Sequence, residues 1–293
     1  QRGGAPYYGR AQRAAMVQAG MSKSFTHDRA SVECDPETVV GVEQRGFNAW
    51  PAQRTVLCGD WLLRAAQGHT KRANSANAQQ PGARLDALLP QIEAFYERQG
   101  LPAIFRLSPL ASPEADAQLA QAGYLLADPS LVMRAALTDM APPANDQGWT
   151  LAIQAQPGTA WLQGFAQAGA VPDQHRQAHH HMLQSIAWTA AFASLQVGGG
   201  MGGGAGGEVV GFGLAVVERG CVGLYDIVIT PALRGQGLGR ALVHGLMHWG
   251  QTQGAQWAEL QVRAPNMVAR GLYESLGFQA LYGYHYRLPA SAL

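Results

Sequence analysis

The 293-residue sequence has few charged residues and only three cysteines. Asp, Glu, Lys and Arg make up 14% of the chain and the formal net charge is +1, so the basic excess that holds a protein on nucleic-acid phosphates is missing. Cys34, Cys58 and Cys221 lie far apart and form no C-x-x-C pair, which argues against a disulfide framework or a cysteine zinc site. No apolar run approaches the ~18 residues of a membrane-spanning helix, and no secretory signal opens the chain. We therefore expect a cytoplasmic protein that binds neither nucleic acid nor membrane.

Apolar residues make up 47% of the chain, which is enough to build sizeable cores. A chain of this length is more typical of two domains than of one. Residues 1–30 are rich in Gly, Ala, Arg and Gln and predict a flexible tail. Pro, Asn, Asp and Gly cluster in residues 141–148, which predicts a linker between a domain at 31–140 and a second domain at 149–293.

The second domain alternates strand-like and helix-like patterns. An i, i+3, i+4 apolar stripe begins at Leu238 and predicts a helix with one buried face. Period-2 alternation and β-branched runs predict strands, and strands that alternate with helices predict an α/β (α+β) fold with a mixed sheet. The expected strands are 149–153, 191–197, 209–217, 221–230, 257–262 and 281–288, with helical segments at 158–187, from 238 and at 266–276.

A glycine-spaced loop runs from one of these strands into the helix at Leu238. Arg234, Gly237 and Gly239 match the pattern R/Q-x-x-G-x-G/A. Glycines at these positions let backbone N–H groups converge at a helix N-terminus, which forms an anion site suited to a diphosphate. The loop lacks the Gly-Lys-Ser/Thr of a Walker A motif and the spacing of a dinucleotide-binding motif.

A second motif, Asn266-Met-Val-Ala-Arg-Gly-Leu-Tyr-Glu-Ser-Leu-Gly-Phe278, follows directly after the next strand. With the glycine loop, it closely resembles the signature of the GCN5-related N-acetyltransferase (GNAT) superfamily, over residues 209–288. The resemblance implies a mixed, mostly antiparallel sheet flanked by helices, acetyl-CoA as co-substrate, no metal, and acetyl transfer to an amine.

The resemblance also implies roles for individual residues. Tyr273 would protonate the departing CoA thiolate, and the alternative is a core tyrosine packed on the sheet. Asn266 would contact the cofactor arm, and main-chain amides of the glycine loop would hold the diphosphate. The implied cofactor-binding residues are Ile227, Val228, Ile229, Arg234, Gly235, Gln236, Gly237, Leu238, Gly239, Arg240, Asn266 and Ala269.

The general base is less clearly marked. A strand carboxylate in the cleft could deprotonate an ammonium substrate, and we favour Asp226 over Glu259 and Glu218. Each of the three could equally be a solvated or salt-bridged carboxylate. His175 and His179 stand four residues apart on a predicted helix; we interpret them as a polar or substrate-facing helix surface, because no carboxylate or cysteine set accompanies them as metal ligands.

The two halves of the chain align with each other at an offset of 154 residues. Gly123-Tyr124 then falls on Gly277-Phe278, which predicts two tandem acetyltransferase-like domains; the alternative is a chance offset. The first copy would be degenerate, because residues 80–85 lack the key glycines and Leu119 stands opposite Tyr273.

The first half also contains a polar stretch, Thr70–Ser75, which reads as the second strand of a hairpin. Alternation would place Thr70, Arg72 and Asn74 on one face. Either that face closes the substrate cleft, with Arg72 and Asn74 contacting substrate, or it is a solvated hairpin. The glycine run 198–207 reads as an insertion between two strands.

Taken together, these patterns predict an N-acetyltransferase that moves an acetyl group from acetyl-CoA to the primary amine of a small molecule by direct attack in a ternary complex. The alternatives are a protein lysine or N-terminal acetyltransferase and a non-catalytic acyl-CoA-binding sensor. Oligomerisation is compatible with the sequence.

Overall fold

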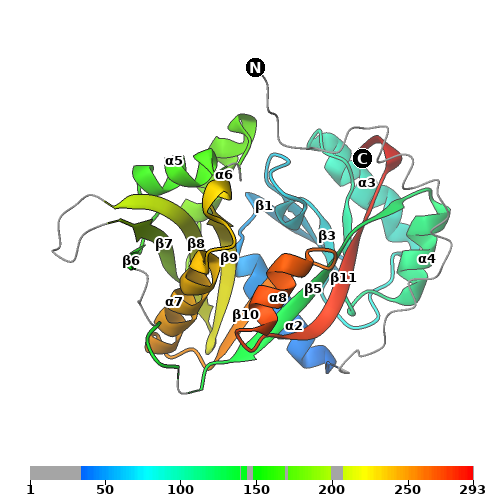
Figure 1. The fold of residues 1–293 in the computed structure, drawn as a ribbon. Helices are drawn as coiled ribbons and strands as arrows, with labels where there is room; N and C mark the ends of the chain where they lie inside the picture. The colour runs from blue at the N-terminus through cyan, green and yellow to red at the C-terminus, as the bar shows by residue number, and fades with distance from the viewer. Residues whose placement is uncertain (1–33, 139, 144–147, 169–170, 199–206, 293) are drawn as a thin grey trace. The chain divides into compact units, whose positions relative to one another are not determined.

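The strands of the chain form one continuous sheet in the computed structural model, which describes residues 34–138, 140–143, 148–168, 171–198 and 207–292 (Figure 1). The order across the sheet is β1-β2-β3-β4-β11-β5-β10-β9-β8-β7-β6, and all neighbours are antiparallel except β3–β4 and β9–β10. The predicted fold class, a mixed and mostly antiparallel sheet flanked by helices, is therefore confirmed. The strands are β1 (Arg54–Cys58), β2 (Trp61–Ala65), β3 (Ala76–Ala78), β4 (Phe105–Leu107), β5 (Leu125–Ala136), β6 (Trp149–Gln154), β7 (Thr189–Val197), β8 (Glu208–Glu218), β9 (Cys221–Ile229), β10 (Trp257–Arg263) and β11 (Gln279–Leu288).

Side chains at the helix starts explain several of the helix boundaries. Asp35 accepts a hydrogen bond from the Thr38 N–H at 2.8 Å, and Ser112 accepts one from the Ala115 N–H at 3.1 Å; a proline follows each cap. In the described residues no helix is both long and apolar enough to cross a membrane. The helices are α2 (Pro36–Ala49), α3 (Leu89–Arg98), α4 (Pro113–Gln121), α5 (Thr159–Gln167), α6 (Arg176–Gln184), α7 (Leu238–Thr252) and α8 (Met267–Glu274).

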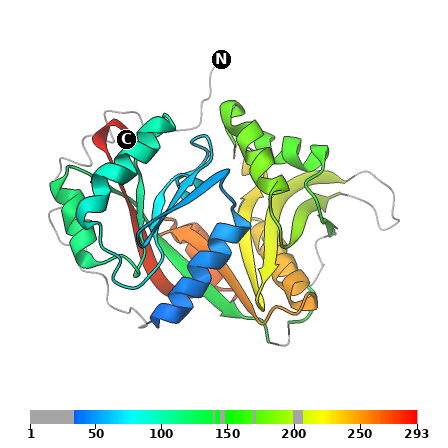
Figure 2. The ribbon, with the colours of Figure 1, turned by 180° about the vertical axis from the view of Figure 1, so that it is seen from behind.

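Different helices cover the two faces of the β6–β10 part of the sheet. Leu242 and Leu246 of α7 belong to the apolar cluster on one face. Phe165 of α5 and Met182 of α6 belong to the cluster on the other face, together with Trp50 at the end of α2. α7 is in front of the strands in Figure 1, and α2 is in front in the reverse view of Figure 2. The end of α2, from the first half of the sequence, therefore packs with the second half.

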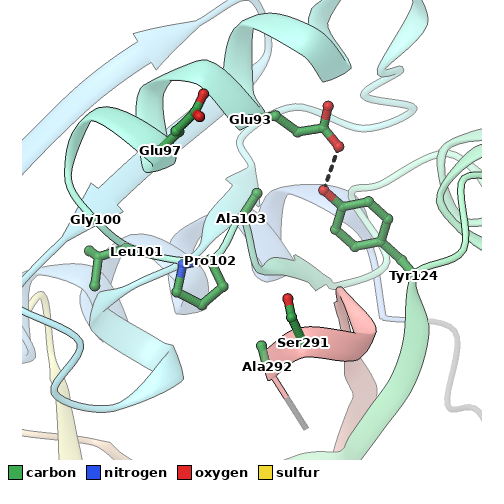
Figure 3. A pocket seen from close by; sticks show the side chains of 9 residues that line it. All are labelled: Glu93, Glu97, Gly100, Leu101, Pro102, Ala103, Tyr124, Ser291 and Ala292. Atoms are coloured by element: carbon green, nitrogen blue, oxygen red, sulfur yellow. Dashed lines mark hydrogen bonds between the residues drawn. The ribbon is translucent and has the colours of Figure 1, made fainter.

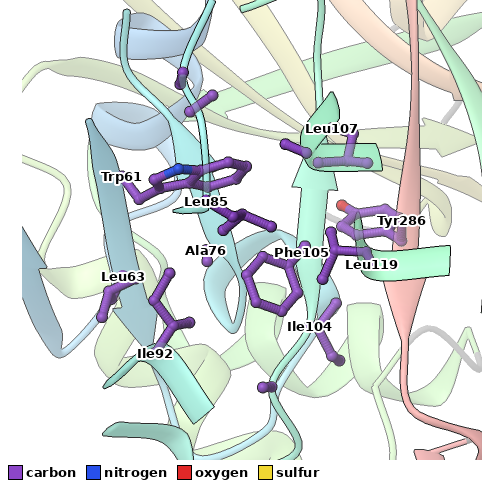
Figure 4. Close-up of a cluster of buried hydrophobic side chains, with 14 of the residues drawn as sticks. Trp61, Leu63, Ala76, Leu85, Ile92, Ile104, Phe105, Leu107, Leu119 and Tyr286 are labelled. Atoms are coloured by element: carbon purple, nitrogen blue, oxygen red, sulfur yellow. The ribbon is translucent and has the colours of Figure 1, made fainter. Parts of the chain in front are cut away.

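Strands from the two halves of the chain are interleaved. β11, the last strand, lies between β4 and β5, and β5 pairs in turn with β10 of the second half. Tyr282, Tyr284 and Tyr286 of β11 belong to the apolar core of the first half, where Tyr286 lies near Phe105 (Figure 4). The sheet thus continues across the predicted linker at 141–148, and residues 34–293 form one compact unit.

Elements recur at the offset of 154 residues. α4 and α8 begin at Pro113 and Met267, each after an N-cap side chain, and β5 and β11 begin at Leu125 and Gln279. The predicted tail 1–30, residues 144–147 of the linker and residues 199–206 of the glycine run lie outside the described residues.

Two local predictions were wrong. The stretch Thr70–Ser75 is not a strand, because Lys71–Ala73 is a 3-10 turn and Thr70 has a left-handed φ of 58°, which no extended strand contains. β2 instead pairs with the short β3 and with β1, a strand that was not predicted. The helical segment at 158–187 is divided into α5 and α6.

Candidate functional site

β9 and β10 are parallel strands that separate part-way along their length. They pair over residues 221–224 and 257–260, whereas the strands continue to Ile229 and Arg263. On its other edge, β9 stays paired with β8 as far as Ile229. The backbone groups of residues 225–229 that face β10 therefore have no strand partner in the described part of the chain. Such groups form an edge to which an extended ligand can hydrogen-bond.

A β-bulge in β9 sets the direction of the side chains at this opening. The register with β8 shifts here, and Asp226 has a left-handed φ of 50°. Because the bulge interrupts strict alternation, Tyr225 and Asp226 both lie on the α5–α6 face, where Tyr225 joins the core and Asp226 contacts α6. Ile227 and Ile229 pack on the α7 face, and Val228 packs on the α5–α6 face.

The loop between β9 and α7 leads into a helix start whose backbone N–H groups are exposed. Gly235 and Gly237 are exposed and have φ angles of 78° and 81°, in the left-handed region that favours glycine. Gly237 is the N-cap residue of α7, and no side chain caps this helix. Gly239 lies in the first turn, where a Cβ would come 3.4 Å from Leu272. An uncapped helix start with exposed N–H groups is suited to an anion.

The side chains of this loop are mostly engaged elsewhere. Arg234 Nε donates to the Ile229 carbonyl at 3.0 Å, and Arg240 Nη1 donates to the Ser275 carbonyl at 3.2 Å. The Leu238 side chain is buried in the α7 core, and Gln236 is exposed. The loop can therefore bind a ligand chiefly through its main chain, and its assignment to a diphosphate stays a prediction.

α8 brings the second motif to the same region. Asn266 is the N-cap residue of α8, and its Oδ1 accepts from the Ala269 N–H at 3.2 Å. Tyr273 is partly buried against the α7 core and lies edge-on to Phe278, with 5.9 Å between ring centroids. Burial raises the pKa of Tyr273, so its hydroxyl keeps its proton at neutral pH. A protonated hydroxyl beside the opening is suited to donate a proton.

Asp226 forms a pair with His179 of α6. The distance between His179 Nε2 and Asp226 Oδ2 is 2.8 Å, and the ring of Phe165 stacks on the imidazole at 5.2 Å between centroids. His179 is only 3% exposed, so it does not lie on a solvated polar helix surface and faces Asp226 instead, whereas His175 is half-buried. The buried neighbours Ala178 and Met182 on the same helix could have indicated this. No group of three or more metal-ligating side chains occurs among the described residues.

A loop of the first half lies beside this pair. The ring of His69 is edge-on to that of His179, at 5.0 Å between centroids. The Arg72 guanidinium lies 5.5 Å from the centroid of the Trp50 ring and 5.8 Å from that of the Tyr225 ring. Trp50 in turn lies 5.8 Å from His179. The structure therefore brings Arg72 next to Tyr225, the residue that precedes the predicted base, although the two segments are far apart in the sequence.

Asn74 has a different position. Its Oδ1 accepts from the N–H groups of Ala66 and Gly68, at 2.7 and 3.0 Å, and its Nδ2 donates to the carbonyls of His69 and Thr70, at 2.8 Å each. The side chain is 4% exposed. Since its hydrogen-bonding capacity is used within the loop, Asn74 positions His69 and Thr70 and is not placed to contact a substrate.

The two other carboxylates considered as bases are bound by cationic and amide groups. Glu259 lies between Arg45 and Arg134, at 2.7 and 2.6 Å. Although its burial favours the neutral acid, the hydrogen bonds from both arginines hold its pKa below the usual range. Glu218 accepts two hydrogen bonds from Asn48. Both residues join the two halves of the chain, and neither is free to accept a proton from a substrate.

Hollows in the surface lie both near and far from these residues. A cavity of about 430 Å³ lies between α5 and β6–β8 and reaches Thr230 and Pro231 at the start of the glycine loop. Another, of about 540 Å³, is lined by residues of α3 and of the C-terminal segment, where Tyr124 donates to Glu93 at 2.7 Å (Figure 3). The second hollow contains none of the residues of the two motifs.

Comparisons with known proteins agree with this arrangement. The family model described as "Probable histone acetyltransferase Rv0428c C-terminal" matches residues 38–287. The "Uncharacterized N-acetyltransferase YobR" of Bacillus subtilis is 29% identical over 249 residues, which cover 84% of this chain and 97% of that protein. The [ribosomal protein bS18]-alanine N-acetyltransferase of Escherichia coli K12 is 39% identical over 72 residues, 25% of this chain and 49% of that enzyme.

Two solved structures show the same fold. The GCN5-related N-acetyltransferase from Kribbella flavida aligns with a TM-score of 0.64 and 15% identity, over 88% of this chain and 96% of that one. A tandem GNAT protein from the clavulanic acid biosynthesis pathway aligns with a TM-score of 0.58 and 14% identity, over 85% and 87% of the two chains. The chain is therefore an N-acetyltransferase of the GCN5-related superfamily and belongs to the family of the Rv0428c C-terminal region.

Proposed function

We propose that this protein transfers an acetyl group from acetyl-CoA to the primary amine of a small molecule, by direct attack of the amine on the thioester. One observation carries the proposal: the unpaired segment of β9 begins beside Asp226 and ends at the glycine loop. A cofactor extended along this segment would have its diphosphate at α7 and its acyl end near the Asp226–His179 pair.

The residues at the opening fit such a cofactor. The uncapped start of α7 offers main-chain N–H groups from residues 235–240 to a diphosphate. Residues 227–229 offer backbone groups to an amide-containing arm, as an edge strand does. Acetyl-CoA would supply an activated acetyl thioester at this place.

Asp226 and Tyr273 are the proposed proton acceptor and donor. Asp226 takes a proton from the substrate ammonium, which frees the nitrogen lone pair to form the C–N bond while the C–S bond breaks. Tyr273 gives its proton to the departing sulfur, and the acylated nitrogen then loses its second proton to solvent, from which Tyr273 is reprotonated. His179 holds the carboxylate in place through its 2.8 Å contact. Cys221 is buried beside Glu259, and no cysteine occurs in either motif to form an acyl-enzyme.

The limited access to Asp226 favours a small acceptor. The Asp226 side chain is 13% exposed and that of His179 is 4% exposed, and the first-half loop with His69 and Arg72 lies next to them. A flexible small amine enters such a site more readily than a lysine on a folded protein.

We further infer that the first half is a diverged copy that binds no cofactor. At the offset of 154 residues, Ala83 takes the place of Gly237 and Leu85 that of Gly239. Both side chains are buried, and the main chain of Ala83 bonds to Leu110 and Ser112. Those bonds join the segments that follow β3 and β4, whereas the corresponding gap between β9 and β10 stays open.

Calorimetry and a thiol-release assay test the proposal together. Gly237→Ala with Gly239→Ala should weaken acetyl-CoA binding, because a Cβ strains the left-handed backbone at Gly237 and presses on Leu272 at Gly239, which shifts the N–H groups that a diphosphate would meet. Gly254→Ala is the matched control, since Gly254 also has a positive φ, 85°, with nothing within 4 Å of an added Cβ. Unchanged affinity in the folded double variant would contradict the cofactor site, and tight binding without acetylation of any amine would favour an acyl-CoA sensor.

A further inference from the structure

We propose that the acceptor amine carries an anionic group that binds to Arg72, so that the substrate is a small zwitterion such as an amino acid. This inference rests on the proposed function. It concerns the part of the site around Arg72, which is separated from Asp226 by the rings of Trp50 and Tyr225.

Arg72 has hydrogen-bond donors to spare. Its guanidinium contacts the faces of Trp50 and Tyr225, and among the described residues no hydrogen bond or ion pair joins it to an acceptor. Its Nε is buried and has no hydrogen-bond partner in the part of the chain that the structure describes. In contrast, the guanidinium groups of Arg45 and Arg106 are bound by carboxylates. A planar guanidinium held beside two aromatic rings is prepared to bind a carboxylate or a phosphate through two parallel hydrogen bonds.

The surroundings of Arg72 have a surplus of positive charge. Arg64 is fully buried next to it and donates to the carbonyl oxygens of Arg72 and Phe47, at 2.7 and 3.2 Å; among the described residues no carboxylate pairs with it. Burial and the nearby charges of Arg106 and Arg72 lower the pKa of Arg64 to about 10. Because partly desolvated positive charge is costly without an anion, a bound anionic group would compensate these two arginines.

The amine has a separate place at the other edge of the same aromatic surface. Trp50 stacks on Tyr225 with 6.1 Å between centroids, and His179 lies 5.8 Å from Trp50. Asp226 follows Tyr225 directly and is bonded to His179. His69, whose Nε2 is buried without a partner, lies on the same side. An ammonium group near Asp226 and an anionic group near Arg72 would therefore lie at opposite edges of one ring surface.

Matched pairs of amines test the proposal on the full chain with saturating acetyl-CoA. The pairs are β-alanine and β-alaninamide, γ-aminobutyrate and its amide, and ethanolamine phosphate and ethanolamine. We expect the anionic member to have a kcat/KM at least about 10-fold higher, mainly through KM. The phosphate pair distinguishes a phosphate-bearing substrate from a carboxylate-bearing one.

Variants of Arg72 then separate the charge from the packing. Arg72→Met should lower kcat/KM for the anionic amines about 10- to 100-fold more than for their neutral partners, and Arg72→Lys should restore part of the preference. Arg98→Met, at an exposed position on α3, is the charge-matched control and should behave as the parent protein.

The inference would be overturned by equal rates for the anionic and neutral members in the parent protein, or by an equal loss for both in Arg72→Met. Preferred acetylation of neutral peptide amines would also overturn it. If no amine is acetylated, the proposed function fails, and calorimetry decides the inference separately. N-acetyl-β-alanine should then bind the CoA-loaded protein, and binding unaffected by Arg72→Met would refute the role of Arg72.

Discussion

Replacing Asp226 with asparagine separates the proton-accepting role of this residue from its role in the β-bulge. Asp226 has a φ of 50°, and asparagine is one of the few residues besides glycine that tolerate this conformation. The asparagine amide can also keep a hydrogen bond to His179, at the 2.8 Å seen for the carboxylate. The bulge should therefore persist, and the substitution removes only the negative charge.

The expected losses differ greatly between catalysis and stability. A positioned base contributes about 10²–10⁴-fold to the rate, so kcat at pH 7 should fall by about that factor. Replacing one charge-assisted hydrogen bond with a neutral one costs about 1–2 kcal/mol, which corresponds to a decrease in Tm of roughly 2–8 °C. The affinity for acetyl-CoA should change by less than about threefold, since the main-chain donors of the glycine loop are not altered.

Thiol release at saturating acetyl-CoA, measured from pH 6 to 9.5, distinguishes these expectations. Without a base, the rate should follow the fraction of substrate amine that is already neutral, so the variant should gain more from increasing pH than the parent protein. Asp173→Asn is the control, because this exposed carboxylate on the turn before α6 pairs with Arg176 and, in the described part of the chain, with no residue of the site. Full activity at pH 7 in a folded Asp226→Asn protein would refute the assignment.

Four further predictions concern other parts of the molecule. Tyr273→Phe should lower turnover about 10²–10⁴-fold without weakening acetyl-CoA binding; equal turnover at neutral pH would leave Tyr273 a packing residue. Residues 149–293 produced alone should show no cooperative urea transition, because β10 and β11 lose their partner β5; a cooperative transition would contradict this. Burial and two neighbouring histidines lower the pKa of His69 to about 4. The free energy of unfolding should therefore decrease by roughly 1–3 kcal/mol as the pH falls from 6.5 to 4, and urea titrations should show a smaller decrease for His69→Gln. Glu43→Gln should destabilise the fold by about 3–5 kcal/mol, because it leaves the buried Arg106 charge without a partner; a Tm within about 2 °C of the parent protein would argue against this.

Ionic and amide contacts, besides the shared sheet, hold the two halves together. Arg45 of α2 binds Glu259 of β10, which also binds Arg134 of β5. Asn48 of α2 binds Glu218 of β8. These contacts position Trp50, at the end of α2, beside Tyr225 and His179. The acceptor side of the site is therefore assembled from both halves of the chain.

The sequence by itself was sufficient for features that depend on local backbone chemistry. Gly235 and Gly237 have the positive φ angles that the loop into α7 requires, and the helix predicted from residue 266 is α8, which Asn266 caps. Such features can be recognised from a few consecutive residues, because a cap or a left-handed turn is satisfied by its near neighbours in the chain. The α/β class with a mixed sheet followed from local periodicities, whereas the mostly antiparallel sheet was expected from the family resemblance.

The tertiary structure alone decided which distant residues meet. The position of β11 between β4 and β5, the burial of His179 against Asp226, and the stacking of Arg72 on Trp50 and Tyr225 join segments 20 to more than 150 residues apart. For polar residues such as His179 and Asn74, the residue type and its position in the sequence are the same whether the side chain faces water or a buried partner. Their roles depend on which strand or loop packs over them, and the physical reason is that strand order and buried hydrogen-bond partners are set by the packing of the whole sheet.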